Sequence, residues 1–221
     1  MARLYLITDE TLGLEANLKL FTTEFLAGCG VFQLRLDNLS DREFHQAALE
    51  FSRRCHEAGV PFIVNDRVDI ALAAGADGVH LGADDLPVEV VRRLVGGELL
   101  IGRTVRNRQQ AVDAQRDGAS YLAAGPCFGT QTKPALEPIG VGAVKEITAA
   151  CELPVCAIGG ITPDKLALVL DAHPAYTAVI SSVTRSDDPA KAKQKLVTML
   201  SIDEHNLQPR RLEKRGGSGE S

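Results

Sequence analysis

The sequence has no tryptophan, and aromatic residues make up only 5% of its 221 residues. Proteins that bind single-stranded nucleic acid stack the bases on aromatic side chains, so this scarcity argues against such a role. The formal net charge of −5 also makes the chain a poor general binder of polyanions. We therefore expect no nucleic-acid partner, and a bound anion must be held by a local site.

The chain also lacks the patterns of disulfide frameworks, zinc fingers and membrane spans. Its five cysteines form no C-x-x-C pair, which predicts reduced and mostly buried thiols. No apolar run approaches the ~20 residues of a membrane helix, and the N-terminus has no long apolar segment of the signal-peptide type. We expect a cytoplasmic protein without a membrane partner, and a homo-oligomer is compatible with the sequence.

What the chain does have is a repeated alternation of apolar and amphipathic segments, with no linker between them. Short apolar runs predict strands at residues 4–8, 31–36, 61–65, 78–81, 99–104, 120–124, 154–158 and 177–180. Amphipathic stretches predict helices at residues 15–27, 40–58, 68–74, 87–95, 108–117, 142–150, 163–170 and 189–200.

Eight such units predict a parallel sheet covered by helices, closed into a single-domain (β/α)8 TIM barrel over residues 1–200. An open doubly wound sheet is the alternative, although no G-x-G-x-x-G follows the first strand. Residues 201–221 form a polar tail that we expect to be disordered. Helix starts are predicted by a capping box at Ser40 and by prolines at Pro163 and Pro189.

In this architecture, functional groups belong at the carboxyl ends of the strands. Gln33 and Arg35 share one face of the second strand, where they are either an anion clamp or, with Asp37, part of a structural salt bridge. Asp66 and Asp85 end the third and fourth strands, which are neighbours in a barrel. They either share a magnesium ion or serve as helix caps and turn residues.

Other strand ends carry weaker signals. His80 alternates with apolar residues, which favours a hydrogen-bonded core histidine over a catalytic one. The stretch 125–140 is long for a connecting loop and predicts either a lid over a diphosphate or an ordinary polar loop. Gly159 and Gly160, together with the serines after the eighth strand, favour a phosphate site over a simple tight turn.

Taken together, several short motifs resemble the thiamine-phosphate synthase family. They are residues 5–9 (YLITD), 33–35 (QLR), 65–67 (NDR), 78–82 (GVHLG), 125–126 (GP), 130–133 (TQTK) and 157–161 (AIGGI). The resemblance implies an alkyl- or aryl-transferring enzyme that joins hydroxymethylpyrimidine diphosphate to hydroxyethylthiazole phosphate. It further implies a magnesium-dependent, dissociative reaction, in which diphosphate leaves before the thiazole nitrogen attacks.

The resemblance also implies roles for individual residues. It places magnesium ligands at Asp66 and Asp85, and pyrimidine-diphosphate contacts at Gln33, Arg35 and Asn65. In the lid it implies that Lys133 meets the diphosphate, and that Thr130 and Thr132 lie near the thiazole phosphate. The implied cradle for that phosphate comprises Gly160, Ile180 and Ser181. Residues expected to take part in catalysis are Arg35, Thr104 and Lys133.

The chain departs from the family pattern at two strand ends. Asp37 stands where the family usually has a lysine, and Thr104 stands where a serine is usual but keeps the hydroxyl. Arg103 or Arg106 is a hypothetical replacement for the missing lysine charge. Three alternative functions remain: a thiazole tautomerase-like isomerase, a non-catalytic binder of thiamine phosphates, and a barrel enzyme acting on another phosphorylated substrate.

Overall fold

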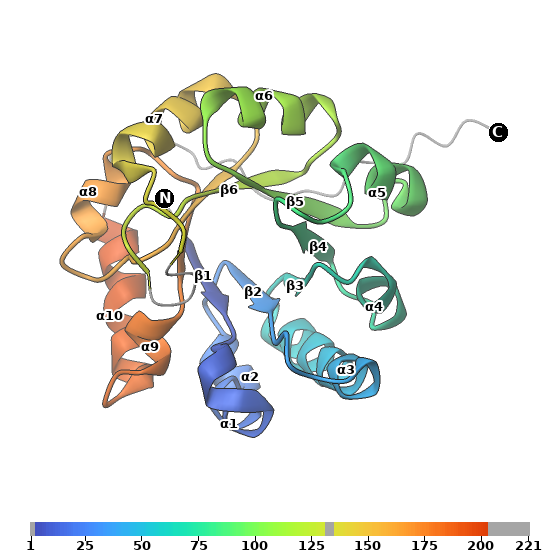
Figure 1. Ribbon diagram of the computed structural model, residues 1–221. Helices are drawn as coiled ribbons and strands as arrows, with labels where there is room; N and C mark the ends of the chain where they lie inside the picture. The colour runs from blue at the N-terminus through green and yellow to red at the C-terminus, as the bar shows by residue number, and fades with distance from the viewer. Residues whose placement is uncertain (1–2, 131–134, 203–221) are drawn as a thin grey trace.

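Hydrogen bonds between β1 and β8 close eight parallel strands into a barrel, as the computed structural model shows for residues 3–130 and 135–202. The strands follow one another around the ring in sequence order (Figure 1). This closure confirms the predicted TIM barrel and excludes the open sheet. The strands are β1 (Arg3–Ile7), β2 (Val31–Leu34), β3 (Phe62–Asn65), β4 (Gly78–Leu81), β5 (Leu100–Val105), β6 (Tyr121–Ala124), β7 (Val155–Ile158) and β8 (Tyr176–Val179).

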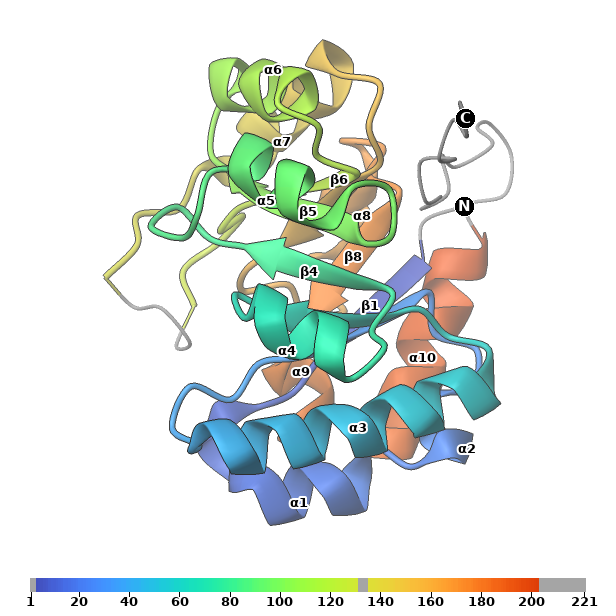
Figure 2. The same cartoon turned by 90° about the vertical axis from the view of Figure 1, so that its right-hand side faces the viewer.

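Helices surround the strands, and Figure 2 shows α1 and α3 on one side of them and α5 and α6 on the other. Their bounds are α1 (Gly13–Leu20), α2 (Thr23–Leu26), α3 (Asp41–Ala58), α4 (Val68–Ala73), α5 (Val88–Val95), α6 (Arg108–Arg116), α7 (Gly140–Ala150), α8 (Leu166–Leu170), α9 (Ser181–Thr184) and α10 (Pro189–Ile202). A 3-10 turn, η1, covers Glu10–Leu12. The sequence did not predict η1 or α9.

Local capping explains where several helices begin. Ser40 and Glu43 form the predicted capping box at the start of α3. The single helix expected over residues 15–27 is wrong, because the Thr22 hydroxyl accepts from the Phe25 N–H and starts α2 afresh. Pro163 also does not start a helix, since α8 begins at Leu166 after a turn.

The last described helix, α10, begins where the sequence predicted. Pro189 does open α10, and the Asp188 carboxylate caps it by accepting from the Lys191 N–H at 3.0 Å. This helix reaches Ile202, just beyond the expected domain limit, and residues 203–221 lie outside the described residues.

All five cysteines are free thiols, and four are buried, as the sequence predicted. Among the described residues, no helix has the length and apolar character needed to span a bilayer.

Side chains of each strand alternate between the two faces of the barrel wall. Phe32 of β2 points outward, and its ring centre lies 5.1 Å from that of Phe51 in α3. Tyr5 of β1 points inward, and its ring centre lies 6.2 Å from that of Tyr121 across the interior. The larger apolar cluster therefore joins strands to helices, and a smaller cluster fills the barrel.

Close packing of β4 against its neighbours leaves no room for a side chain at Gly78. A Cβ there would lie 2.6 Å from the Leu100 carbonyl oxygen. We expect Gly78→Ala to lower the free energy of unfolding by about 1–3 kcal/mol, as overpacked sites do. Gly142→Ala, in open space within α7, is the matched control and should raise it by about 0.5–1 kcal/mol. Urea unfolding of both variants measures this, and equal stabilities would contradict the packing argument.

Candidate functional site

A cavity of about 310 Å³ opens at the carboxyl ends of the strands. Its position confirms that the strand ends are where polar groups gather in this barrel. Ten of the twelve residues to which the family resemblance gave a site role line it together: Gln33, Arg35, Asn65, Asp66, Asp85, Thr104, Thr130, Gly160, Ile180 and Ser181. The other two, Thr132 and Lys133, lie outside the described residues.

Asp66 and Asp85 line the same cavity from the ends of adjacent strands. Asp66 has a φ of 61°, a left-handed conformation that aspartate tolerates better than most residues. Its carboxylate accepts a 2.7 Å hydrogen bond from the Asn65 amide. The Asp85 carboxylate accepts from the Gly82 N–H at 2.6 Å, so this residue also has the turn role that the sequence left open. The described residues contain no cluster of three or more His, Cys, Asp or Glu side chains suited to a metal.

The cavity wall near these two residues carries an excess of negative charge. Arg35 is the one arginine or lysine among the described lining residues, whereas Asp37, Asp66, Asp84 and Asp85 supply four carboxylates. Arg35 and Asp37 form an ion pair with a 3.5 Å distance between Nη2 and Oδ2. The structural salt bridge therefore exists, but Arg35 also faces the cavity. Sequence reasoning missed Asp84 as a lining residue.

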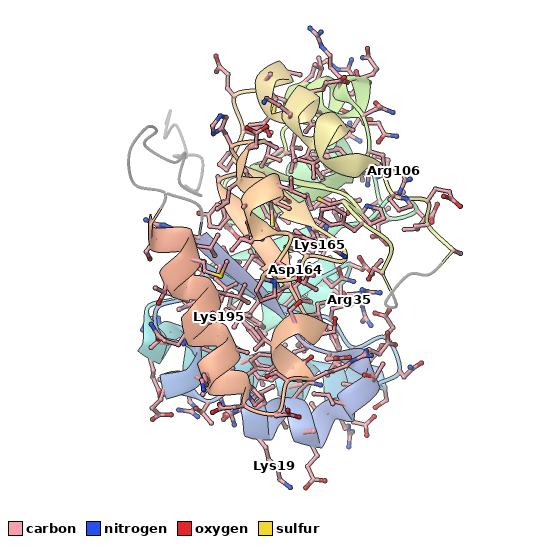
Figure 3. All side chains as sticks on the ribbon, turned by 90° about the vertical axis from the view of Figure 1, so that its left-hand side faces the viewer. Lys19, Arg35, Arg106, Asp164, Lys165 and Lys195 are labelled. Atoms are coloured by element: carbon pink, nitrogen blue, oxygen red, sulfur yellow. The ribbon has the colours of Figure 1, made fainter. Side chains whose placement is uncertain are left out.

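Arg103 and Arg106 do not take the place of the missing lysine among the described lining residues. Arg103 donates from Nη1 to the Gly82 carbonyl oxygen at 2.5 Å and holds the loop that carries Asp85. Arg106 donates from Nη2 to the Glu137 carbonyl oxygen at 2.6 Å. Figure 3 shows Arg35 and Arg106 on the side of the molecule where the loop after β6 extends. Both guanidinium groups bind loop carbonyls, so the hypothesis that one of them replaces the missing lysine charge finds no support.

The opposite part of the cavity, formed after β7 and β8, is neutral and rich in backbone. Gly159 and Gly160 both have positive φ values, 100° and 62°. A Cβ on Gly160 would collide with the Gly129 carbonyl oxygen, so the glycines are needed for the close approach of the loop after β6. The Ser182 hydroxyl donates to the Ile161 carbonyl oxygen at 2.5 Å and ties the two loops together. Lys165 is not among the described lining residues but lies close by, with Nζ 3.5 Å from the Gly160 carbonyl oxygen.

An ion pair between buried Asp9 and partly exposed Arg185 holds the segment that begins with Ser181. Asp9, just after β1, accepts from the Thr184 hydroxyl at 2.7 Å and from Arg185 Nε at 3.0 Å. Burial alone would raise the pKa of the Asp9 carboxyl, but hydrogen bonds from Arg185, Thr11 and Thr184 outweigh it and lower that pKa to about 2. Sequence reasoning missed this pair, whose members are far apart in the chain.

The floor of the cavity is a row of buried polar side chains. Gln33 Nε2 donates to the Tyr5 hydroxyl at 2.8 Å, and the Tyr5 and Tyr121 hydroxyl oxygens lie 2.9 Å apart. His80 lies 3.1 Å from the Tyr121 hydroxyl through Nδ1 and 2.9 Å from Thr104 Oγ1 through Nε2. His80 is therefore the hydrogen-bonded core residue that the sequence favoured, and it also lines the cavity.

A closed (β/α)8 barrel with a polar cavity at its carboxyl strand ends has the general form of a TIM-barrel enzyme. The chain belongs to the thiamine monophosphate synthase family, whose model matches residues 4–183. It is 42% identical over 202 residues to thiamine-phosphate synthase of Chloroflexus aurantiacus, covering 90% of this chain and 93% of that relative. The corresponding protein of Methanoculleus marisnigri is 45% identical over 195 residues, covering 87% and 92%.

Among solved structures, thiamine phosphate pyrophosphorylase from Pyrococcus furiosus matches with a TM-score of 0.82. The two proteins are 34% identical, and the match covers 92% of this chain and 97% of the other. The similarity thus extends over the whole barrel and includes every strand that contributes to the cavity.

The lowered pKa of Asp9 predicts a pH-dependent stability. A carboxyl whose pKa falls from 3.8 to about 2 on folding stabilises the fold by about 2 kcal/mol above pH ~4, and this is lost as pH falls towards 2. Asp9→Asn should therefore cost about 2 kcal/mol near neutral pH and progressively less in acid. Urea unfolding across that pH range measures the difference, and a cost independent of pH would contradict the prediction.

Proposed function

We propose that this protein condenses 4-amino-2-methyl-5-hydroxymethylpyrimidine diphosphate with hydroxyethylthiazole phosphate, forming thiamine phosphate and releasing diphosphate. Membership of the thiamine monophosphate synthase family supports this reaction. The observation that carries the proposal is the convergence of ten residues with implied site roles, from seven of the eight strand ends, on one cavity. That cavity has one acidic and one neutral part, so it offers two distinct environments for two substrates.

A magnesium ion is proposed for the acidic part. Four carboxylates face one arginine among the described lining residues, so a diphosphate alone would be repelled there. Magnesium is usually held by one or two carboxylates together with substrate phosphate oxygens and water, which suits Asp66 and Asp85. When bound, the ion would neutralise charge on the leaving diphosphate.

The chain's own residues would position and stabilise the reactants. Arg35 offers a guanidinium fork to the diphosphate beside Asn65, and Gln33 and Thr104 lie at the cavity floor to hold the pyrimidine. In a dissociative reaction the carbon–oxygen bond to diphosphate breaks first, and the thiazole nitrogen captures the resulting pyrimidine carbocation. Catalysis then consists mainly of positioning and charge stabilisation. The neutral part would hold the thiazole phosphate through Gly160, Ile180 and Ser181.

One feature favours a second function, a binder without turnover. Asp37 forms an ion pair with Arg35 and adds a carboxylate to the proposed diphosphate site. This weakens the site's attraction for diphosphate unless a cation is present. The tautomerase alternative is less well supported, because a tautomerase needs no metal and gives Asp66 and Asp85 no chemical role.

The function is tested by incubating the protein with both substrates in magnesium and, separately, in EDTA. In a single turnover at enzyme excess, we expect thiamine phosphate and diphosphate to appear only with magnesium. Bound but unreacted substrates would support the non-catalytic binder. Thiazole isomerisation without metal would support the tautomerase.

Removal of either proposed magnesium ligand should impair the reaction. We expect Asp66→Asn and Asp85→Asn each to lower kcat/KM on the order of 100-fold, because charge on the leaving group loses its stabilisation. Asparagine suits the left-handed backbone at Asp66, so the fold should persist. Asp69→Asn is the control, since Asp69 pairs with Arg67 and is not among the described lining residues. Unchanged kcat/KM and magnesium dependence in both variants would contradict the metal assignment.

A further inference from the structure

The row of polar side chains beneath the cavity crosses the barrel interior from β2 to β5. Gln33 and Thr104, at its two ends, both line the cavity, whereas Tyr5 and Tyr121 lie below it and are almost fully buried. Each successive pair is within hydrogen-bond distance, from 2.8 to 3.1 Å. The proposed reaction assigns no role to the two tyrosines.

The direction of every hydrogen bond in the row follows from its first member. Burial raises the pKa of both tyrosines, so each hydroxyl keeps one proton to donate. Tyr5 accepts from the Gln33 amide, and Tyr121 offers the one other hydrogen-bonding atom near its hydroxyl among the described residues, so the buried Tyr5 proton finds an acceptor when it is donated to Tyr121. Tyr121 in turn donates to His80 Nδ1, which must then be unprotonated. A neutral His80 consequently carries its proton on Nε2 and donates it to Thr104.

The space around this row is shaped to keep its members together. Gly102 lies between His80 and Tyr121 in the strand register, on the strand that separates β4 from β6. A Cβ on Gly102 would lie 2.5 Å from His80 Nδ1 and would collide with the Tyr121 ring. The imidazole and the phenol thus meet directly over a position without a side chain.

We propose that Tyr5 and Tyr121 are positioning residues, which hold His80 as its Nε2–H tautomer and thereby turn the Thr104 hydroxyl proton into the cavity. Because Thr104 Oγ1 accepts from His80, its own proton is left to donate to an acceptor atom of the substrate. The tautomer can be tested without any reaction, whereas the consequence for catalysis rests on the proposed function.

The tautomer is measured by long-range 1H–15N correlation spectroscopy on the ligand-free protein labelled with 15N-histidine, with His80→Gln used to assign the signals. We expect the pattern of a neutral imidazole protonated on Nε2. Tyr121→Phe and Tyr5→Phe should each convert this pattern into a tautomer mixture. Tyr176→Phe is the matched control, because it removes the same oxygen from another interior tyrosine at the start of β8, and it should leave the pattern unchanged.

Kinetics then test whether the tyrosines act through Thr104. We expect Tyr121→Phe to lower kcat by about 10- to 100-fold, as loss of other supporting partners does, with little change in KM. In a Thr104→Val background the same substitution should cost almost nothing further, because the proton it orients is already gone. Thr104→Ser should keep the dependence on Tyr121, and Tyr176→Phe should leave kcat near that of the wild type.

Two results would overturn the proposal. A proton on Nδ1 of His80, in a neutral imidazole or in an imidazolium, would mean that His80 donates to Tyr121 and that the tyrosines do not set the tautomer. In the neutral case Thr104 would also donate to Nε2 and present a lone pair to the cavity. Additive effects of Tyr121→Phe and Thr104→Val would mean that the tyrosine acts only on stability. Absence of condensing activity would instead overturn the proposed function, while the tautomer measurement would still stand or fall by itself.

Discussion

The hydrogen bonds between the first and last strands are the constraint on which the site depends. Since all eight strands are parallel, closing the ring brings every carboxyl end to one opening. Closure also places Asp9, after β1, against Arg185, after β8, although 176 residues separate them in sequence. That ion pair holds the end of α9, the short helix that begins with Ser181, so the neutral part of the cavity is as much a product of ring closure as the acidic part.

The two parts of the cavity differ in the charge of the side chains that line them. Near Asp66 and Asp85, carboxylates outnumber the arginine, and an anion needs a cation to enter. Near Gly159 and Gly160, the polar groups of the lining are backbone and hydroxyl groups beside apolar side chains. With Lys165 close by, an anion can be held there directly. Under the proposed reaction, this difference would direct the diphosphate, with its metal, to one part and the simpler phosphate to the other.

Much of this arrangement could be predicted from the sequence, because it follows from local patterns. Apolar runs gave the strand order, and the rule that function lies at the carboxyl strand ends brought residues as distant as Gln33 and Ser181 into one cavity. Hydrogen-bond and ion-pair partners that meet across the barrel could not be predicted from the sequence. Nothing near Asp9 in sequence indicates Arg185, and nothing near Tyr5 indicates Tyr121. The hypothesis that Arg103 or Arg106 replaces the missing lysine charge finds no support for the same reason, since both side chains bind loop carbonyls.

The polar floor is costly to bury, and stability alone gives little reason for it. A hydrogen bond in a protein interior contributes only about 1 kcal/mol net, and replacing both partners with apolar groups of the same shape can be nearly neutral. Phenylalanine at both tyrosine positions would fill the same space. What an apolar floor cannot do is hold His80 in one tautomer through Nδ1, because it offers no hydrogen-bond donor to that atom. The two buried hydroxyls therefore make physical sense as a means of orienting the group above them.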